Sequence, residues 1–379
     1  MKPADRLTLI VQVKDQTHLL ERWLVWAQEN QTALPIIVAD GSYGPEARAL
    51  LEGSRFRNLR LSYFSRGTDN NRNEFYQKTV AALEKCQTPY CALLADDDLL
   101  DFGSLLDMCR ALEDPQNVCV RGWVHNFSLT EGTPEVFHPS VQSLPQDPSL
   151  DDPRSSDRVR RHFLLYNLNF HDIFRVQDLI GFKRKLLQNR IEDPFLGELF
   201  TSVLAVIQGK VVRRDIPFLY RASRRASNDQ RYFREHDNWD RMFLGHWMRE
   251  YQQCLDLWHA ASDGELDKNW LHCLFRSYYA PSIVDCLRKD LVRERLQRGS
   301  YHGALSRPSR GPIWVKVLLE SLRPFEKAAQ KLREQKKRAS AVSEIEKEKT
   351  RVDCSHGKIV EFLSRYHSGM GQAELQRFL

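Results

Sequence analysis

The hydrophobic positions at the start of the chain form short apolar runs separated by segments with helical spacing. Leu7 to Val13 and Pro35 to Ala39 are β-rich runs, and residues 19–28 between them repeat apolar side chains at helical intervals. A strand, a helix and a second strand in this order are typical of a βαβ unit with parallel strands. The pattern continues with a strand over 59–64, an amphipathic helix over 73–86 and a strand over 90–95.

The pattern becomes less regular in the rest of the chain. We expect a strand over 118–127, and the Pro/Ser/Asp-rich stretch 139–157 predicts a loop or linker. From His236 onward nearly every segment has helical spacing. The segments between are predicted as helices over 158–166 and 193–208, an extended segment over 170–176, a strand and turn over 210–220, and an Arg-rich loop over 221–230.

Carboxylates follow the predicted strands. Asp96, Asp97 and Asp98 come directly after the run 90–95, and Asp40 ends the second strand in an Asp-Gly-Ser sequence. The carboxyl ends of parallel strands meet at one edge of a sheet, where hard oxygen ligands suit Mg²⁺ or Mn²⁺ with a diphosphate. The alternative is a helix cap before Phe102, but a cap needs one carboxylate, and adjacent like charges repel. The triplet therefore favours a metal or phosphate site.

Three of these segments carry a family resemblance. Residues 7–13, the run from Ile36 to Ser42, and Thr88-Pro89-Tyr90 leading into Asp96 to Asp98 resemble the nucleotide-sugar half of a GT-A glycosyltransferase of the family 2, bacterial type. The resemblance extends through 193–199 to Gly209-Lys210 and covers roughly residues 6–225. It implies an enzyme that transfers a sugar, with inversion, from a nucleotide-diphosphate donor to an acceptor hydroxyl.

The resemblance, which ends near residue 225, and the helical spacing after His236 together predict a domain organisation. The fold class expected is α/β, with a GT-A (Rossmann-like, mostly parallel sheet) domain over 1–232 and a mainly α-helical domain over 233–379. The nucleotide-sugar half would span about 1–128, and the acceptor half about 158–232.

In that family the Asp of the second strand contacts the nucleobase or ribose, which would be Asp40 here. Its alternative is an ordinary Asp-Gly turn. The DXD motif falls on Asp96 and Asp98, with Asp98 as the direct metal ligand, while a different alignment pairs Asp97 with Asp98. Mn²⁺ or Mg²⁺ there would neutralise the diphosphate and stabilise it as a leaving group.

Two acids compete as the general base that deprotonates the acceptor. Glu198 has the spacing to Gly209 that best fits the family's base, and Asp193, in Glu192-Asp193, resembles the family's Glu-Asp pair. Asp193 precedes Pro194 and is also a natural helix N-cap. For Glu198 the alternative is a solvated helix residue. We favour Glu198.

Several cations and a histidine are weaker candidates. Lys78 and Arg66 are placed to reach the donor phosphates, although a surface cation is more often merely solvated. His171 lies in the acceptor half, where a lone His is more often structural. A third group, the loop with Arg221, Arg224 and Arg225, is either a lid over the diphosphate or an exposed basic loop.

The turn after the first strand departs from the family pattern. It reads Gln12-Val13-Lys14-Asp15 and offers no aromatic side chain to stack on a base, so Asp15 is a candidate replacement contact. A UDP-sugar is the default donor by resemblance, with guanosine or thymidine diphosphate left open.

Composition indicates how large a hydrophobic core the chain can form and in which cellular compartment it lies. The chain has 379 residues, of which 42% are hydrophobic, so it can bury a sizeable core in two domains. Its eight cysteines form no CxxC pair, which is typical of buried thiols in a reducing compartment and argues against structural zinc. The apolar stretch before Lys14 and Asp15 is too short for a secretory signal, so we expect a cytoplasmic protein.

A basic segment near the end suggests a second location. Residues 299–338 hold ten Lys or Arg against three Glu, a local net charge of +7, and residues 313–322 are apolar on one face. The segment 313–338 is therefore a candidate for peripheral contact with the inner face of a membrane, near a lipid-linked acceptor. The alternative is a helix that packs on the core and has a solvated basic extension. A glycan or another hydroxyl compound is equally open as the acceptor.

Three other functions stay open. A nucleotidyltransferase would use a similar sheet and metal but usually has a Gly-rich phosphate loop, and Val11 to Thr17 contains no glycine. A non-catalytic protein that binds nucleotide sugars or glycans would not need acids at three strand ends. Sugar transfer to a modified base of nucleic acid is compatible with the basic segment.

Overall fold

A computed structural model describes residues 5–130, 133–137, 149–165, 171–222, 245–277 and 357–368. Helices and strands alternate through its first half. Their bounds are β1 Leu7–Val13, α1 Thr17–Glu29, β2 Pro35–Asp40, α2 Glu46–Glu52, β3 Arg60–Ser65, α3 Arg72–Leu83, β4 Tyr90–Ala95, β5 Leu99–Leu100 and α4 Leu105–Ala111.

The second half has longer strands and the helices that cover them. Their bounds are β6 Asn117–Thr130, β7 Thr133–Phe137, α5 Ser155–Leu165, β8 Ile173–Arg175, α6 Val176–Gln188, α7 Pro194–Gln208, β9 Lys210–Ala222 and α10 Gly245–Ala261. Two further helices cover 268–277 and 357–367.

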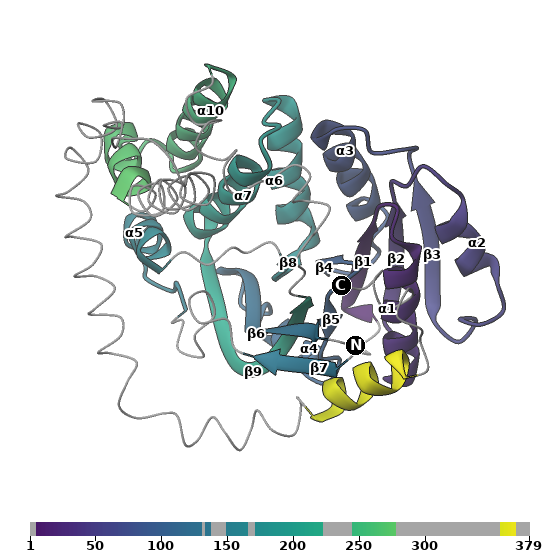
Figure 1. Ribbon diagram of the computed structural model, residues 1–379. Coiled ribbons are helices and arrows are strands. Elements are labelled where there is room, and N and C mark those ends of the chain that lie inside the picture. Colours follow the sequence, from purple (N-terminus) through teal and green to yellow (C-terminus); the bar gives the residue numbers. More distant parts are fainter. Residues whose placement is uncertain are drawn as a thin grey trace, which may run out of the picture.

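The strands of the described residues form one mixed sheet of nine strands (Figure 1). Its order is β3-β2-β1-β4-β8-β6-β9-β5, with β7 paired to β6. β3, β2, β1 and β4 are mutually parallel, β8 is antiparallel to both of its neighbours, and β6 and β9 run parallel to each other. The fold is thus α/β, with the expected parallel half at one side of the sheet.

The central strands are buried on both faces, as their continuous Val/Ile/Leu runs require. Alternate residues of β1 belong to different cores: Ile10 to one, Leu9 and Val11 to the other. The first core is completed by α3, α5, α6, α7 and α10, and the second by α1, α2, α4 and the 357–367 helix. The molecule therefore has helices packed on each face of a single sheet.

The helices α3 and α7 begin at side-chain caps. The Asn71 side chain accepts from the backbone N–H of Glu74 at the start of α3, and Asp193 does the same for Leu196 at the start of α7. Pro194 follows Asp193 at the first helical position, where its missing N–H costs no hydrogen bond. These caps fix where each helix leaves the edge of the sheet.

The predicted strands over 7–13, 35–39, 59–64 and 90–95 are present as β1 to β4. The expected extended segment 170–176 is shorter, because β8 covers Ile173–Arg175 and α6 begins at Val176. That helix was not expected.

The helical expectation for the last part of the chain holds for α10, 268–277 and 357–367. The division into two domains stays a prediction. α10 packs against α7, and Trp247, Tyr251 and Trp258 belong to the same core as the sheet.

The basic segment 313–338 lies outside the described residues, so its membrane contact stays a prediction. In the part of the chain that the structure describes, no helix is long and apolar enough to cross a bilayer.

Candidate functional site

The strand register brings Asp40 and Asp96 to either side of β1. Asp40 pairs with Val13, and Gln12 pairs with Ala95, which directly precedes Asp96. All three strands are parallel, so these residues meet at the carboxyl edge of the sheet. Asp40 is buried, with 2% of its surface exposed, and Asp96 has 9% exposed. The sequence prediction that these acids share one edge is supported by this register.

The Asp40 carboxylate is held in place by two donors. The Ser42 backbone N–H donates to Oδ1 and the Tyr63 hydroxyl donates to Oδ2, each at 2.9 Å. Burial and this bond to Asp40 raise the pKa of Tyr63, so the phenol stays a proton donor. Each carboxylate oxygen has a second acceptor position, so Asp40 retains capacity for a ligand.

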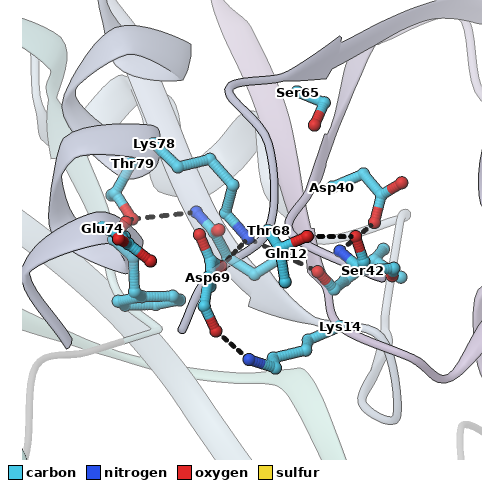
Figure 2. Close-up of polar contacts among 12 residues, drawn as sticks. Gln12, Lys14, Asp40, Ser42, Ser65, Thr68, Asp69, Glu74, Lys78 and Thr79 are labelled. Atoms are coloured by element: carbon cyan, nitrogen blue, oxygen red, sulfur yellow. Dashed lines mark hydrogen bonds and ion pairs between the residues drawn. The ribbon is translucent and has the colours of Figure 1, made fainter. Parts of the chain in front are cut away.

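A buried ion pair lies beside Asp40. Lys78 Nζ is 2.6 Å from Asp69 Oδ2, and both side chains are almost fully enclosed. The ammonium also donates to the Val13 carbonyl at 3.4 Å. Figure 2 shows Lys78 pointing toward Asp69. Burial lowers the pKa of Lys78, while Asp69, Asp40 and Asp96 oppose that shift in this order. Lys78 is therefore an internal cation among three carboxylates and not a solvated surface lysine, and its contact with donor phosphates stays a prediction.

Three loops at this edge are tied together through Asp69. Its N–H donates to the Gly41 carbonyl at 3.0 Å, and Lys14 Nζ donates to the Asp69 carbonyl. A Cβ at Gly41 would lie 2.1 Å from Asp69 Oδ2, so only glycine permits this approach. The loops after β1, β2 and β3 therefore form one connected unit.

Asp15 completes the connection between the first two loops. Its backbone has φ of 56°, a left-handed conformation that Asp tolerates. Its N–H donates to Ser42 Oγ and its Oδ1 accepts from the Tyr43 N–H, each at 2.8 Å. Asp15 thus orders the β2 loop, and its proposed nucleotide contact stays a prediction.

An aromatic side chain stands at the rim of the site, although the β1 turn has none. Tyr43 is 71% exposed, and Lys14 Nζ lies 5.3 Å from its ring centroid. Tyr43 was not predicted, because an aromatic side chain was expected only in the β1 turn, whereas this ring comes from the β2 loop.

Asp98 belongs to a second cluster. It accepts from the Ala222 N–H at 3.2 Å, and its Oδ2 lies 3.5 Å from His171 Nε2 and 3.6 Å from Arg221 Nε. The pairing of Leu99 with Tyr220, between β5 and β9, delivers Arg221 to this carboxylate. Burial and then Arg221 hold the pKa of His171 well below its usual range, so its imidazole is neutral. The candidates His171 and Arg221 thus lie beside Asp98, while Arg224 and Arg225 lie outside the described residues.

This second cluster has the chemistry of a partial metal site. A carboxylate and a neutral imidazole suit Mn²⁺. The metal contact expected of Asp96 stays a prediction. Within the described ranges, no group of three or more His, Cys, Asp or Glu is arranged to hold a metal by itself. The residues fit a cation that takes its remaining ligands from a diphosphate and water.

Asp97 and Arg66 occupy different positions. The Asp97 carbonyl accepts from Arg22 Nη2 at 2.9 Å, so this residue is anchored by its backbone. Arg66 is exposed at the end of β3.

Of the two candidate bases, Asp193 caps α7 and Glu198 lies in its first turns. Asp193 Oδ1 accepts from the Leu196 N–H at 2.9 Å, which is the capping role. Glu198 is half-buried. Burial raises the pKa of Tyr76 on α3, and the Glu198 charge adds to that shift. Burial lowers the pKa of Lys183 on α6 to about 8, and the Glu198 charge opposes that shift.

Tyr76 joins α3 to α7. Its hydroxyl approaches Gly197 so closely that a Cβ there would lie 2.0 Å from the oxygen. Glu198 therefore lies next to the helix that also carries Lys78, which links the two halves of the site.

No protein-family model and no curated protein matches the sequence. Among solved structures, the chain is similar to S. aureus TarS 1–349 in complex with UDP-GlcNAc, at 13% identity and a TM-score of 0.47 over 73% of this chain and 72% of that one. The same fragment in complex with UDP has 12% identity and a TM-score of 0.45 over 73% and 71%. A longer S. aureus TarS chain has 12% identity and a TM-score of 0.43, and 43% of that chain is covered.

Proposed function

We propose that the protein is a metal-dependent glycosyltransferase that moves a sugar from a nucleoside-diphosphate donor to an acceptor hydroxyl with inversion. The observation that carries this proposal is that Asp40 and Asp96 lie at the carboxyl ends of the parallel strands on either side of β1, with Asp98 two residues after Asp96. The sequence resemblance assigns the same three residues to donor and metal binding.

In this proposal Asp40 binds the nucleoside. Its oxygens retain acceptor capacity for ribose hydroxyls or the imide N–H of uracil, and charge-assisted hydrogen bonds are stronger than neutral ones. The exposed Tyr43 ring supplies a surface for stacking against the base. Uridine diphosphate is the default donor nucleotide.

Asp98 and His171 would hold Mn²⁺ or Mg²⁺ next to the diphosphate, and the diphosphate and water would supply the remaining ligands. When bound, the ion would neutralise the charge of the diphosphate and so make the diphosphate a better leaving group. Arg221 lies 3.6 Å from Asp98 with its side chain 48% exposed, so its guanidinium is available to the phosphate oxygens.

Glu198 is assigned as the general base. The acceptor oxygen attacks the anomeric carbon and its proton passes to the Glu198 carboxylate, while the bond from that carbon to the diphosphate breaks and the diphosphate leaves with the electron pair. A single displacement of this kind inverts the anomeric configuration. The acceptor class, a glycan, a lipid-linked compound, a nucleic acid or another hydroxyl compound, is left open by this assignment.

Thermal unfolding with added ligands tests the proposal. A ligand bound only by the native state at about 100 times its dissociation constant stabilises by about 2.7 kcal/mol, which raises Tm by several degrees. We expect this for uridine diphosphate with Mn²⁺, and a smaller effect without metal. Asp98→Asn should remove the metal dependence. If uridine, guanosine and thymidine diphosphates all leave Tm unchanged with Mn²⁺, the proposal is wrong.

A further inference from the structure

Side chains of α1 donate hydrogen bonds to the backbone of the segment after β4, which contains Asp96, Asp97 and Asp98. Arg22 Nη2 donates to the Asp97 carbonyl at 2.9 Å, and Trp26 Nε1 donates to the Leu100 carbonyl at 2.8 Å. Arg22 and Trp26 are one helical turn apart, and 1% and 5% of their surfaces are exposed. Buried carbonyls need such donors, so these two side chains fix the path of residues 97–100.

A third contact extends this support. The Trp23 ring meets the Phe102 ring edge-on, with centroids 6.2 Å apart. One face of α1 therefore contacts the segment after β4 at three successive points.

The 357–367 helix packs on the same part of α1. The Phe362 ring centroid lies 4.8 Å from that of Trp26, and Arg365 pairs with Glu29 at the end of α1. Ile359, Phe362 and Leu363 are almost completely buried in the core that α1 shares. Figure 1 shows this helix, in yellow, next to α1.

The end of this helix also lies near Arg22. His367 is buried with 4% of its surface exposed. Burial and then the Arg22 charge lower its pKa to about 4, so the side chain is neutral beside the guanidinium. The 357–367 helix thus covers both donor side chains. Phe362 covers Trp26, and the last turn of the helix, with His367, lies near Arg22.

We propose that the 357–367 helix is a positioning element of the donor site, which acts through Arg22 and Trp26 on the backbone of Asp96 to Asp98. This inference rests on the proposed function for its catalytic meaning. Without the helix, water would reach Arg22 and Trp26 and compete for the hydrogen bonds to the two carbonyls. The carboxylates would then lose their fixed positions, and small misplacements at such sites cost large factors in binding and rate.

A double-mutant cycle in the full chain tests the proposal. Phe362→Ala removes the ring against Trp26, and Arg22→Met removes the donor to Asp97 but keeps an apolar stem. Ser364→Ala, at an exposed position of the same helix, is the matched control. Two quantities are measured for each variant: amide hydrogen exchange at residues 97–101, and the dissociation constant for uridine diphosphate with Mn²⁺.

We expect each single variant to speed exchange at 97–101 and to weaken nucleotide binding by about tenfold, with exchange in α7 unchanged. The double variant should resemble the stronger single one, because both changes break the same support. Phe362→Leu should restore most of the affinity. Ser364→Ala should match the unmodified protein.

Several outcomes overturn the inference. The inference is wrong if Phe362→Ala leaves amide hydrogen exchange at 97–101 unchanged. It is also wrong if the loss of nucleotide affinity in the double variant equals the product of the losses in the two single variants. If Arg22→Met does not fold, Trp26→Phe takes its place, since it keeps the stacking and removes the donor to Leu100. If the unmodified protein binds no nucleotide, the proposed function fails, and hydrogen exchange alone still decides the positioning role.

Discussion

Asp193 and Glu198 are close in sequence but their carboxylates do different things. Asp193 caps α7 through Leu196, and its own N–H donates to Glu250 Oε2 at 2.8 Å. Glu198 is half-buried and interacts electrostatically with Tyr76 and Lys183. The first carboxylate stabilises a helix end, whereas the second has no capping role in α7, and its role as the general base stays a prediction.

Conservative amide substitutions separate the two roles. Glu198→Gln keeps the shape of the side chain but cannot take a proton, so transfer should fall by ~10²-fold or more with donor affinity unchanged. Asp193→Asn should leave both transfer and Tm nearly unchanged, because Asn caps a helix as well as Asp. Single-turnover transfer rates and donor titrations measure these effects. Normal transfer by Glu198→Gln with loss in Asp193→Asn would move the base to Asp193.

The acids of the site were predictable, but their supports were not. Asp40, Asp96 and Asp98 follow apolar runs, and strand ends in a parallel sheet share one edge. Asp69 reads as an ordinary loop residue, and its pairing with Lys78 depends on how α3 packs against β1. Tyr43 was not predicted either, because the local sequence does not show which of the loops at the strand ends brings an aromatic ring to the site.

At the scale of elements, local patterns located the strands but not their order. β1 to β4 were predicted because apolar runs and helical segments alternate there. The pairing of β9 with β6 joins residues 117–127 to 210–222, and β8 pairs antiparallel between β4 and β6. Pairings over such separations depend on tertiary packing, which local sequence does not encode. The register that places Arg221 beside Asp98 was therefore beyond prediction.

The joined loops after β1, β2 and β3 can be tested at Gly41. An Ala Cβ there would meet the Asp69 carboxylate at 2.1 Å, so the Lys78–Asp69 pair would have to shift. We expect Gly41→Ala to lower the free energy of unfolding by ~1–3 kcal/mol and to weaken nucleotide binding. Urea unfolding and nucleotide titration measure the two effects.

Gly181→Ala is the matched control for this change. It lies inside α6 with nothing within 4 Å of an added Cβ, so it should stabilise by about 0.5–1 kcal/mol through helix propensity. A Gly41→Ala protein as stable as this control would contradict the close packing of Gly41 on Asp69.

At the scale of the whole molecule, the late helices belong to the two cores of the sheet. α10 contributes Trp247, Tyr251 and Trp258 to one core, and the 357–367 helix contributes Phe362 and Leu363 to the other. Sequence spacing predicted their helical state but not these positions, because an amphipathic face does not say which surface covers it. Stability of the α/β part therefore depends on segments distant in sequence.

Buried neutral histidines in both cores predict acid sensitivity. Burial, with the charges of Arg213 and Arg121, lowers the pKa of His162 to about 3, and burial with Arg22 lowers that of His367 to about 4. An unfolded His titrates near pH 6.5, so below that pH the unfolded chain binds more protons than the native one. Stability is then full above about pH 6.5 and is lost as the pH falls toward the native pKa values.

Urea unfolding between pH 4 and 8 measures this loss in the unmodified protein and in two variants, His162→Gln and His367→Gln. Each variant should lose less stability than the unmodified protein as the pH falls below about 6.5, because one proton-linked group has been removed. The effect should be larger for His162→Gln, whose native pKa is further from that of an unfolded His. Identical pH dependence in all three proteins would show that neither imidazole is kept neutral by the fold.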